Sequence, residues 1–161
     1  MSYKSKRILL SMCAGLALTV AYVVHALGKS APAPEDLRGW AALMLIFAGI
    51  GIVAQIVLQL LFHFGYAIGI AVQEHDGDEK KVERIMDANM AEDEMDKLIG
   101  LKGAHAAFVL TGLGFVAALA ALALGASVLA ALHGLLGAFA LANLLEGAVS
   151  IRLYERGVRN G

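Results

Sequence analysis

The chain has 161 residues, a formal net charge of −1 and 59% hydrophobic residues, with a mean hydropathy of +0.71. A composition this apolar excludes an ordinary soluble domain, and the length leaves room for a single domain. The lone cysteine, Cys13, excludes a disulfide framework and a cysteine metal site. We therefore predict one transmembrane domain over residues 1–161.

Four apolar stretches follow one another along the chain, at residues 8–27, 40–72, 104–124 and 126–153. Each is long enough for a helix to cross the hydrocarbon core, which takes about 20 residues. The second stretch is longer than one crossing needs, so we expect its end to project into the cytoplasm. Short connections that carry both prolines or Gly125 join the stretches in pairs. The sequence predicts an all-α, polytopic membrane four-helix bundle.

The sizeable polar part of the chain is residues 73–103, which hold ten of the fourteen acidic residues. Apolar residues at helical spacing predict a short amphipathic helix on the inner membrane surface, with Val82, Ile85, Met86 and Met90 on one face. Asn89 and Glu92 resemble a capping box that opens a second helix, which runs on into the third span. The acidic residues Glu92, Asp93, Glu94 and Asp96 would sit near its N-terminus, where the helix dipole favours negative charge. The run Asp76–Glu79 lacks the alternation of a calcium loop, so no metal site is predicted.

The basic residues predict the orientation of the chain. Eleven of the thirteen precede the first span, lie between the second and third, or follow the fourth, and only Lys29 and Arg38 fall on the other side. The positive-inside rule therefore places both termini and residues 73–103 in the cytoplasm. We predict a multi-pass protein of the inner (plasma) membrane.

Polar side chains form a stripe on the second and fourth spans, while the first and third look mainly apolar. The stripe residues recur at helical spacing: Gln55, Gln59 and His63, and then Asn143, Glu146 and Ser150. We predict that they meet as a polar layer in the inner half of the membrane, with His63 the favoured partner of Glu146. Such a layer is either a proton or cation site or interhelical glue.

Each span also carries one histidine. By depth they sort into an outer pair, His25 with His133, and an inner pair, His63 with His105. Two bis-histidine haems in a four-helix bundle need imidazoles on facing helices at equal depth, so haem b is a candidate cofactor.

A family resemblance rests on the segment just before the third span, Glu92-Asp93-Glu94-Met95-Asp96-Lys97-Leu98-Ile99-Gly100-Leu101-Lys102-Gly103. This segment resembles an uncharacterised family of small four-helix prokaryotic membrane proteins with an acidic segment before the third helix. The resemblance implies the four-helix fold and adds no activity.

Three functions follow from these patterns. The first is a non-enzymatic accessory or regulatory role, exerted through the acidic segment 73–103, because no phosphate loop, nucleophile constellation or metal motif is present. The alternatives are a small proton- or cation-coupled transporter or channel that uses the polar layer, and a haem electron carrier. Expected partners are the lipid bilayer, a second copy of the chain and a cytoplasmic protein, and no nucleic-acid partner is expected.

Overall fold

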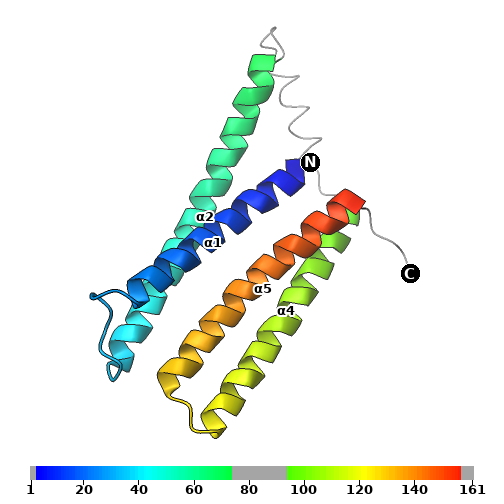
Figure 1. Ribbon diagram of the computed structural model, residues 1–161. Helices are drawn as coiled ribbons and strands as arrows, with labels where there is room; N and C mark the ends of the chain where they lie inside the picture. The colour runs from blue at the N-terminus through cyan, green and yellow to red at the C-terminus, as the bar shows by residue number, and fades with distance from the viewer. Residues whose placement is uncertain (1–2, 74–93, 157–161) are drawn as a thin grey trace.

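The computed structural model describes residues 3–73 and 94–156, which form four helices (Figure 1). They are α1 (Tyr3–Ala26), α2 (Leu37–Gln73), α4 (Glu94–Ala123) and α5 (Val128–Arg156). All four are long and apolar enough to cross a membrane, which confirms the predicted all-α fold with four spans. The amphipathic helix predicted around residues 82–90 lies outside the described residues.

The helix ends carry local capping signals. Asp36 precedes α2 and accepts a hydrogen bond from the Gly39 amide at 2.8 Å, and Ser127 precedes α5 and accepts one from the Ala130 amide at 3.1 Å. Gly125 ends the turn out of α4 with φ of 91°, a left-handed conformation that glycine adopts without strain. These caps set where each helical hairpin reverses.

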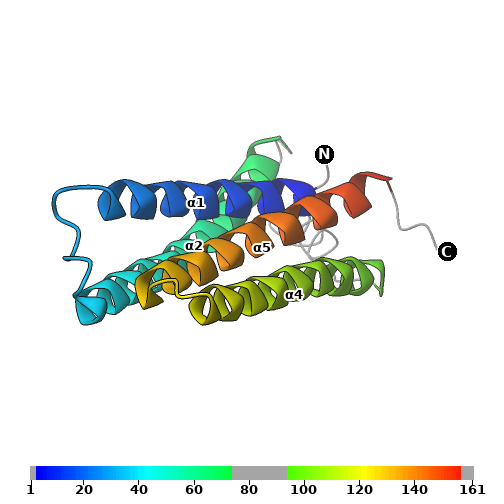
Figure 2. The same ribbon diagram turned by 60° about the horizontal axis from the view of Figure 1, so that its bottom comes forward.

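The helices pack in a spatial order that differs from their chain order. α4 and α5 form the most extensive contact, α5 packs on α1, and α1 packs on α2. Figures 1 and 2 show α5 between α4 and α1, while α2 leans away from the others. We call the end with the two short connections the hairpin end, and the end where α1 begins and α5 finishes the terminal end. The result is an open bundle that α2 does not close.

Small residues set the close helix contacts. A Cβ on Gly103 of α4 would lie 2.6 Å from Ser150 Oγ of α5, and a Cβ on Gly51 of α2 would lie 2.7 Å from Leu18 Cδ2 of α1. In a bilayer, helices associate mainly by backbone approach and van der Waals packing, because lipid is as apolar as the side chains. The Gly- and Ala-rich α4–α5 pair therefore packs most tightly.

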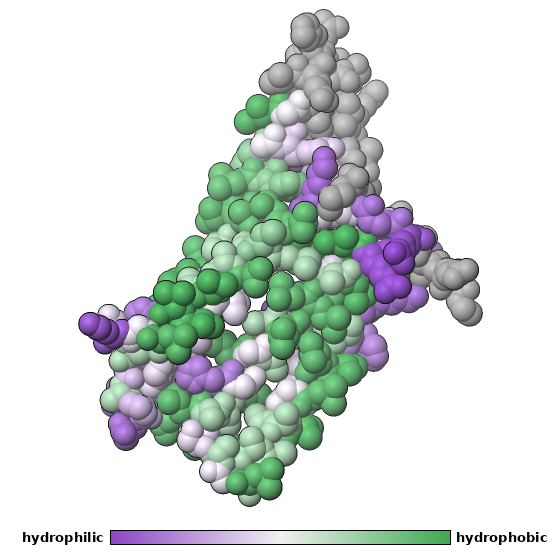
Figure 3. Space-filling view, in the orientation of Figure 1, coloured by the Kyte–Doolittle hydropathy of each residue, from purple (hydrophilic) through white to green (hydrophobic). Residues whose placement is uncertain are grey.

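The outer surface is apolar. Large hydrophobic side chains are exposed along every helix, for example Leu45, Val24, Phe108 and Leu141. On the face drawn in Figure 3, hydrophobic residues cover most of the helices, and hydrophilic residues gather mostly toward the ends. Apolar surface of this extent on four spanning helices fits a lipid bilayer, so the chain is a multi-pass membrane protein.

Candidate functional site

A cleft of about 1040 Å³ lies between α1, α2 and α5. It exists because α2 packs on α1 but does not pack along α5, so the two helices diverge on either side of α1. All six residues predicted to form the polar layer line this cleft: Gln55, Gln59 and His63 from α2, and Asn143, Glu146 and Ser150 from α5. The structure thus brings both stripes to one place.

The helix α1 contributes polar groups that sequence reasoning missed. Tyr3, Arg7 and Ser11 line the same cleft, one turn apart on one face of α1. The expectation that the first span is mainly apolar was therefore incomplete. Their spacing of four was the available signal, but Arg7 was counted only among the basic residues that precede the first span, and Tyr3 was given no role.

The cleft has two zones along its length. The half toward the terminal end holds most of the polar residues, from all three helices. The half toward the hairpin end is mostly apolar, with Leu18, Phe47, Ile52, Leu136 and Phe139 in its wall. Within the lining, Glu146 is the one carboxylate and Arg7 the one lysine or arginine. A bound molecule would therefore meet charge in one half and hydrocarbon in the other.

The hydrogen bonds of the six residues show which of them join two helices. Gln55 donates to Ser11 and joins α2 to α1. Asn143 donates to the Phe139 carbonyl of its own helix at 3.3 Å. Over residues 3–73 and 94–156, Gln55 is the only one of the six that hydrogen-bonds a side chain of another helix, and the predicted His63–Glu146 pair makes no direct bond. Five of the six residues therefore line the cleft without a hydrogen bond that joins two helices in the described part of the chain.

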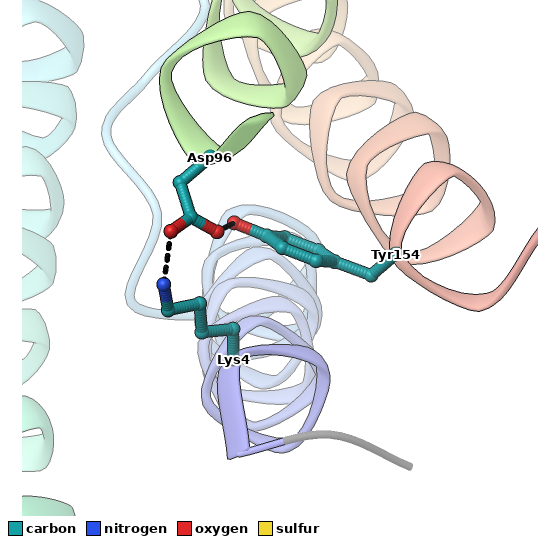
Figure 4. Close-up of polar contacts among 3 residues, drawn as sticks. All are labelled: Lys4, Asp96 and Tyr154. Atoms are coloured by element: carbon teal, nitrogen blue, oxygen red, sulfur yellow. Dashed lines mark hydrogen bonds and ion pairs between the residues drawn. The ribbon is translucent and has the colours of Figure 1, made fainter. Parts of the chain in front are cut away.

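A second polar cluster lies at the terminal end, where Asp96 joins three helices (Figure 4). Asp96 of α4 is only 8% exposed, pairs with Lys4 of α1 and accepts a hydrogen bond from Tyr154 Oη of α5 at 2.9 Å. Sequence reasoning assigned Asp96 to the acidic start of the helix and missed this burial. The signal was the spacing of Asp96, Ile99 and Gly103, which all lie buried on the face of α4 that meets α5.

An aromatic cluster at the hairpin end joins α1, α2 and α5. Tyr22 Oη lies 3.1 Å from His133 Nε2, and His133 Nδ1 lies 2.9 Å from the Leu129 carbonyl. The Trp40 and His133 rings are 4.9 Å apart, edge to face. Because a carbonyl only accepts, Nδ1 donates to Leu129, and Nε2 pairs with the Tyr22 hydroxyl, so both ring nitrogens of His133 are engaged.

The four histidines predicted as haem ligands lie in different surroundings. His25 packs near Phe47, with ring centroids 6.0 Å apart, at the same end as His133. His63 lines the cleft, whereas His105 is exposed on α4, a helix that contributes nothing to the cleft lining. The structure does not bring the inner pair to one site, and haem ligation stays a prediction.

Comparison with models of known protein families, with curated proteins and with solved structures found no match to this chain. The resemblance of residues 92–103 to a four-helix family therefore stays a prediction. The predicted accessory role also stays a prediction, since residues 74–93 of its segment lie outside the described part of the chain.

Proposed function

We propose that this chain is a small carrier of the inner membrane that moves a proton or a small cation through the polar cleft. The observation that supports it is that six polar residues from two helices line one cleft, while within residues 3–73 and 94–156 only Gln55 among them hydrogen-bonds a side chain of another helix. Polar groups that serve as glue are bonded to one another. Ionisable and polar groups at membrane depth that face a cavity usually mark an ion or proton path.

The orientation of the cleft follows from the positive-inside rule. Lys4, Lys6, Lys97 and Arg152 lie toward the terminal end, so this end is proposed to face the cytoplasm. The polar zone then opens toward the cytoplasm, and the aromatic cluster around His133 lies across the outer end. This arrangement corresponds to an inward-open state, in which access alternates when the outer cluster separates.

The chemistry rests on Glu146 and His63. Glu146 is the carboxylate that takes up a proton or pairs with a cation, because it is the only acidic group in the lining. His63 lies one to two turns from Gln55 and Gln59 on α2 and relays protons between the cleft and the terminal end, because an imidazole carries one donor and one acceptor nitrogen.

A second copy of the chain belongs to this proposal. Gln59 and Asn143 are exposed at membrane depth on the open side of the cleft. Lipid offers no hydrogen-bond partners there, so a homodimer that covers this side would exclude lipid from the path. The three helices of one chain that line the cleft, α1, α2 and α5, enclose it on one side only.

The test is ion flux into liposomes that contain the purified full chain. A potassium gradient with valinomycin drives protons inward, and an internal pH dye reports them; sodium flux is followed with a sodium dye. Glu146→Gln should reduce flux to the level of protein-free liposomes while the protein still inserts. Gly15→Leu should do the same by steric block, because Gly15 lines the cleft and a Cβ there meets open space.

Gly49→Leu is the matched control for the steric block. Gly49 also meets open space on a membrane helix, but it lies outside the cleft, so flux should equal that of the wild type. Wild-type flux no greater than that of empty liposomes for both protons and sodium would refute the proposal. Unchanged flux in Glu146→Gln would refute it as well.

A further inference from the structure

A second groove lies on the other face of the α1–α2 pair and is separate from the polar cleft. Its volume is about 490 Å³, and its walls are apolar side chains of both helices, Leu10, Leu58, Leu61 and Phe62. Tyr66 and Lys6 stand at its terminal end. The groove arises because α2 leans away from α1 toward that end (Figure 1).

Lys6 differs from the basic residues beside it. Lys4 is paired with Asp96, and Arg7 lines the polar cleft. Lys6 is exposed, and over residues 3–73 and 94–156 no carboxylate pairs with it. Among the described residues, it therefore places an unpaired positive charge at the mouth of the apolar groove.

We infer that this groove binds one phospholipid with an anionic headgroup. The acyl chain lies along Leu10, Leu58 and Leu61, and the phosphate pairs with Lys6. A groove on the bilayer-facing surface of spanning helices is filled by acyl chains, since water is excluded there. The charge at its mouth selects a negative headgroup, as basic residues between helices do near the membrane surface.

The aromatic residues fix the depth of the headgroup. Tyr3 of α1 contacts Phe62 and Tyr66 of α2, with ring centroids 5.3 and 4.4 Å apart. Tyrosine rings concentrate at the boundary between hydrocarbon and headgroups. Lys6 lies one turn from Tyr3, so its ammonium reaches the phosphate layer by extending along the helix.

The test is native mass spectrometry of the full chain after exchange into detergent with equal, limiting amounts of dioleoyl-phosphatidylglycerol and dioleoyl-phosphatidylcholine. The wild type should retain one phosphatidylglycerol molecule in preference to phosphatidylcholine. Lys6→Gln should lower that preference roughly fivefold, the factor for one basic residue at an anionic surface, while some lipid of either kind still binds. Lys29→Gln, at the hairpin end, should leave the preference unchanged.

Gly65→Leu tests the groove itself. Gly65 lines it and a Cβ there meets open space, so the new side chain fills the groove without moving a helix. Retention of both lipids should fall, whereas Gly49→Leu, outside the groove, should retain them as the wild type does. Unchanged selectivity in Lys6→Gln or unchanged retention in Gly65→Leu would overturn the inference. A dimer that dissociates in Gly65→Leu with no lipid lost would mean that a second copy occupies the groove, which would overturn it too.

Discussion

The closest approach of α4 and α5 predicts that one added methyl group destabilises the protein. A Cβ built on Gly114 would overlap the Cβ of Ala138, while the Ala138 Cα would lie 3.7 Å away, at ordinary contact distance. The overlapping atom belongs to alanine, so no rotamer change relieves it. For two carbons to regain a normal separation, the helices must part by roughly 1.5 Å along this contact.

The magnitude follows from two opposing terms. Overpacking of a fitted contact costs about 1–3 kcal/mol. Replacing glycine by alanine inside a helix stabilises the helix by up to about 1 kcal/mol. Gly114→Ala should therefore lower the free energy of unfolding by about 1–2 kcal/mol, as the difference of the two.

The assay is unfolding in mixed detergent micelles with increasing dodecyl sulfate, followed by fluorescence of Trp40, the only tryptophan. Gly112→Ala is the control, because a Cβ on Gly112 meets nothing within 4 Å, and it should be neutral or stabilising. The double variant Gly114→Ala with Ala138→Gly removes the overlapping atom and should recover most of the loss. If Gly114→Ala is as stable as Gly112→Ala, or if the double variant recovers nothing, the argument from helix approach fails.

Two further predictions concern the terminal cluster and the open side of the cleft. Asp96→Asn breaks the ion pair of a buried carboxylate and should lower the free energy of unfolding by about 1–3 kcal/mol. Glu94→Gln, on the exposed side of the same turn, should change it by less than about 0.5 kcal/mol. Equal effects of the two substitutions would contradict the burial of Asp96. For the open side of the cleft, single cysteines are introduced into a Cys13→Ser background and the membranes are oxidised. Gln59→Cys should give a disulfide-linked dimer, whereas Phe108→Cys, on the outer side of α4, should not. Monomer with both variants would count against the homodimer.

Much of the fold was predictable because the bilayer constrains it. The hydrocarbon core sets the length of a span, so the apolar stretches alone predicted four helices. The short connections, one with both prolines and one with Gly125, predicted the hairpins. The polar stripes were predictable because residues four apart share one face of a helix, which placed Gln55 with Gln59.

The sequence did not predict which helices touch. Contact between membrane helices depends on how closely two particular backbones approach, as at Gly103 and Ser150, and periodicity within one helix carries no information about its partner. For the same reason the role of Asp96 was missed. Its carboxylate is acceptable at a helix start by local rules, and only packing of three helices buries it beside Lys4 and Tyr154.

The sequence by itself determined that four apolar helices cross a membrane and that two of them carry polar stripes, because hydropathy, length and the helical repeat are local properties. Only the tertiary structure decided the spatial order α4, α5, α1, α2 and the separation of α2 from α5. That separation is what makes the stripes line a cleft rather than bond to each other. It depends on side-chain fit between helices distant in sequence, and so it is a property of the assembled molecule.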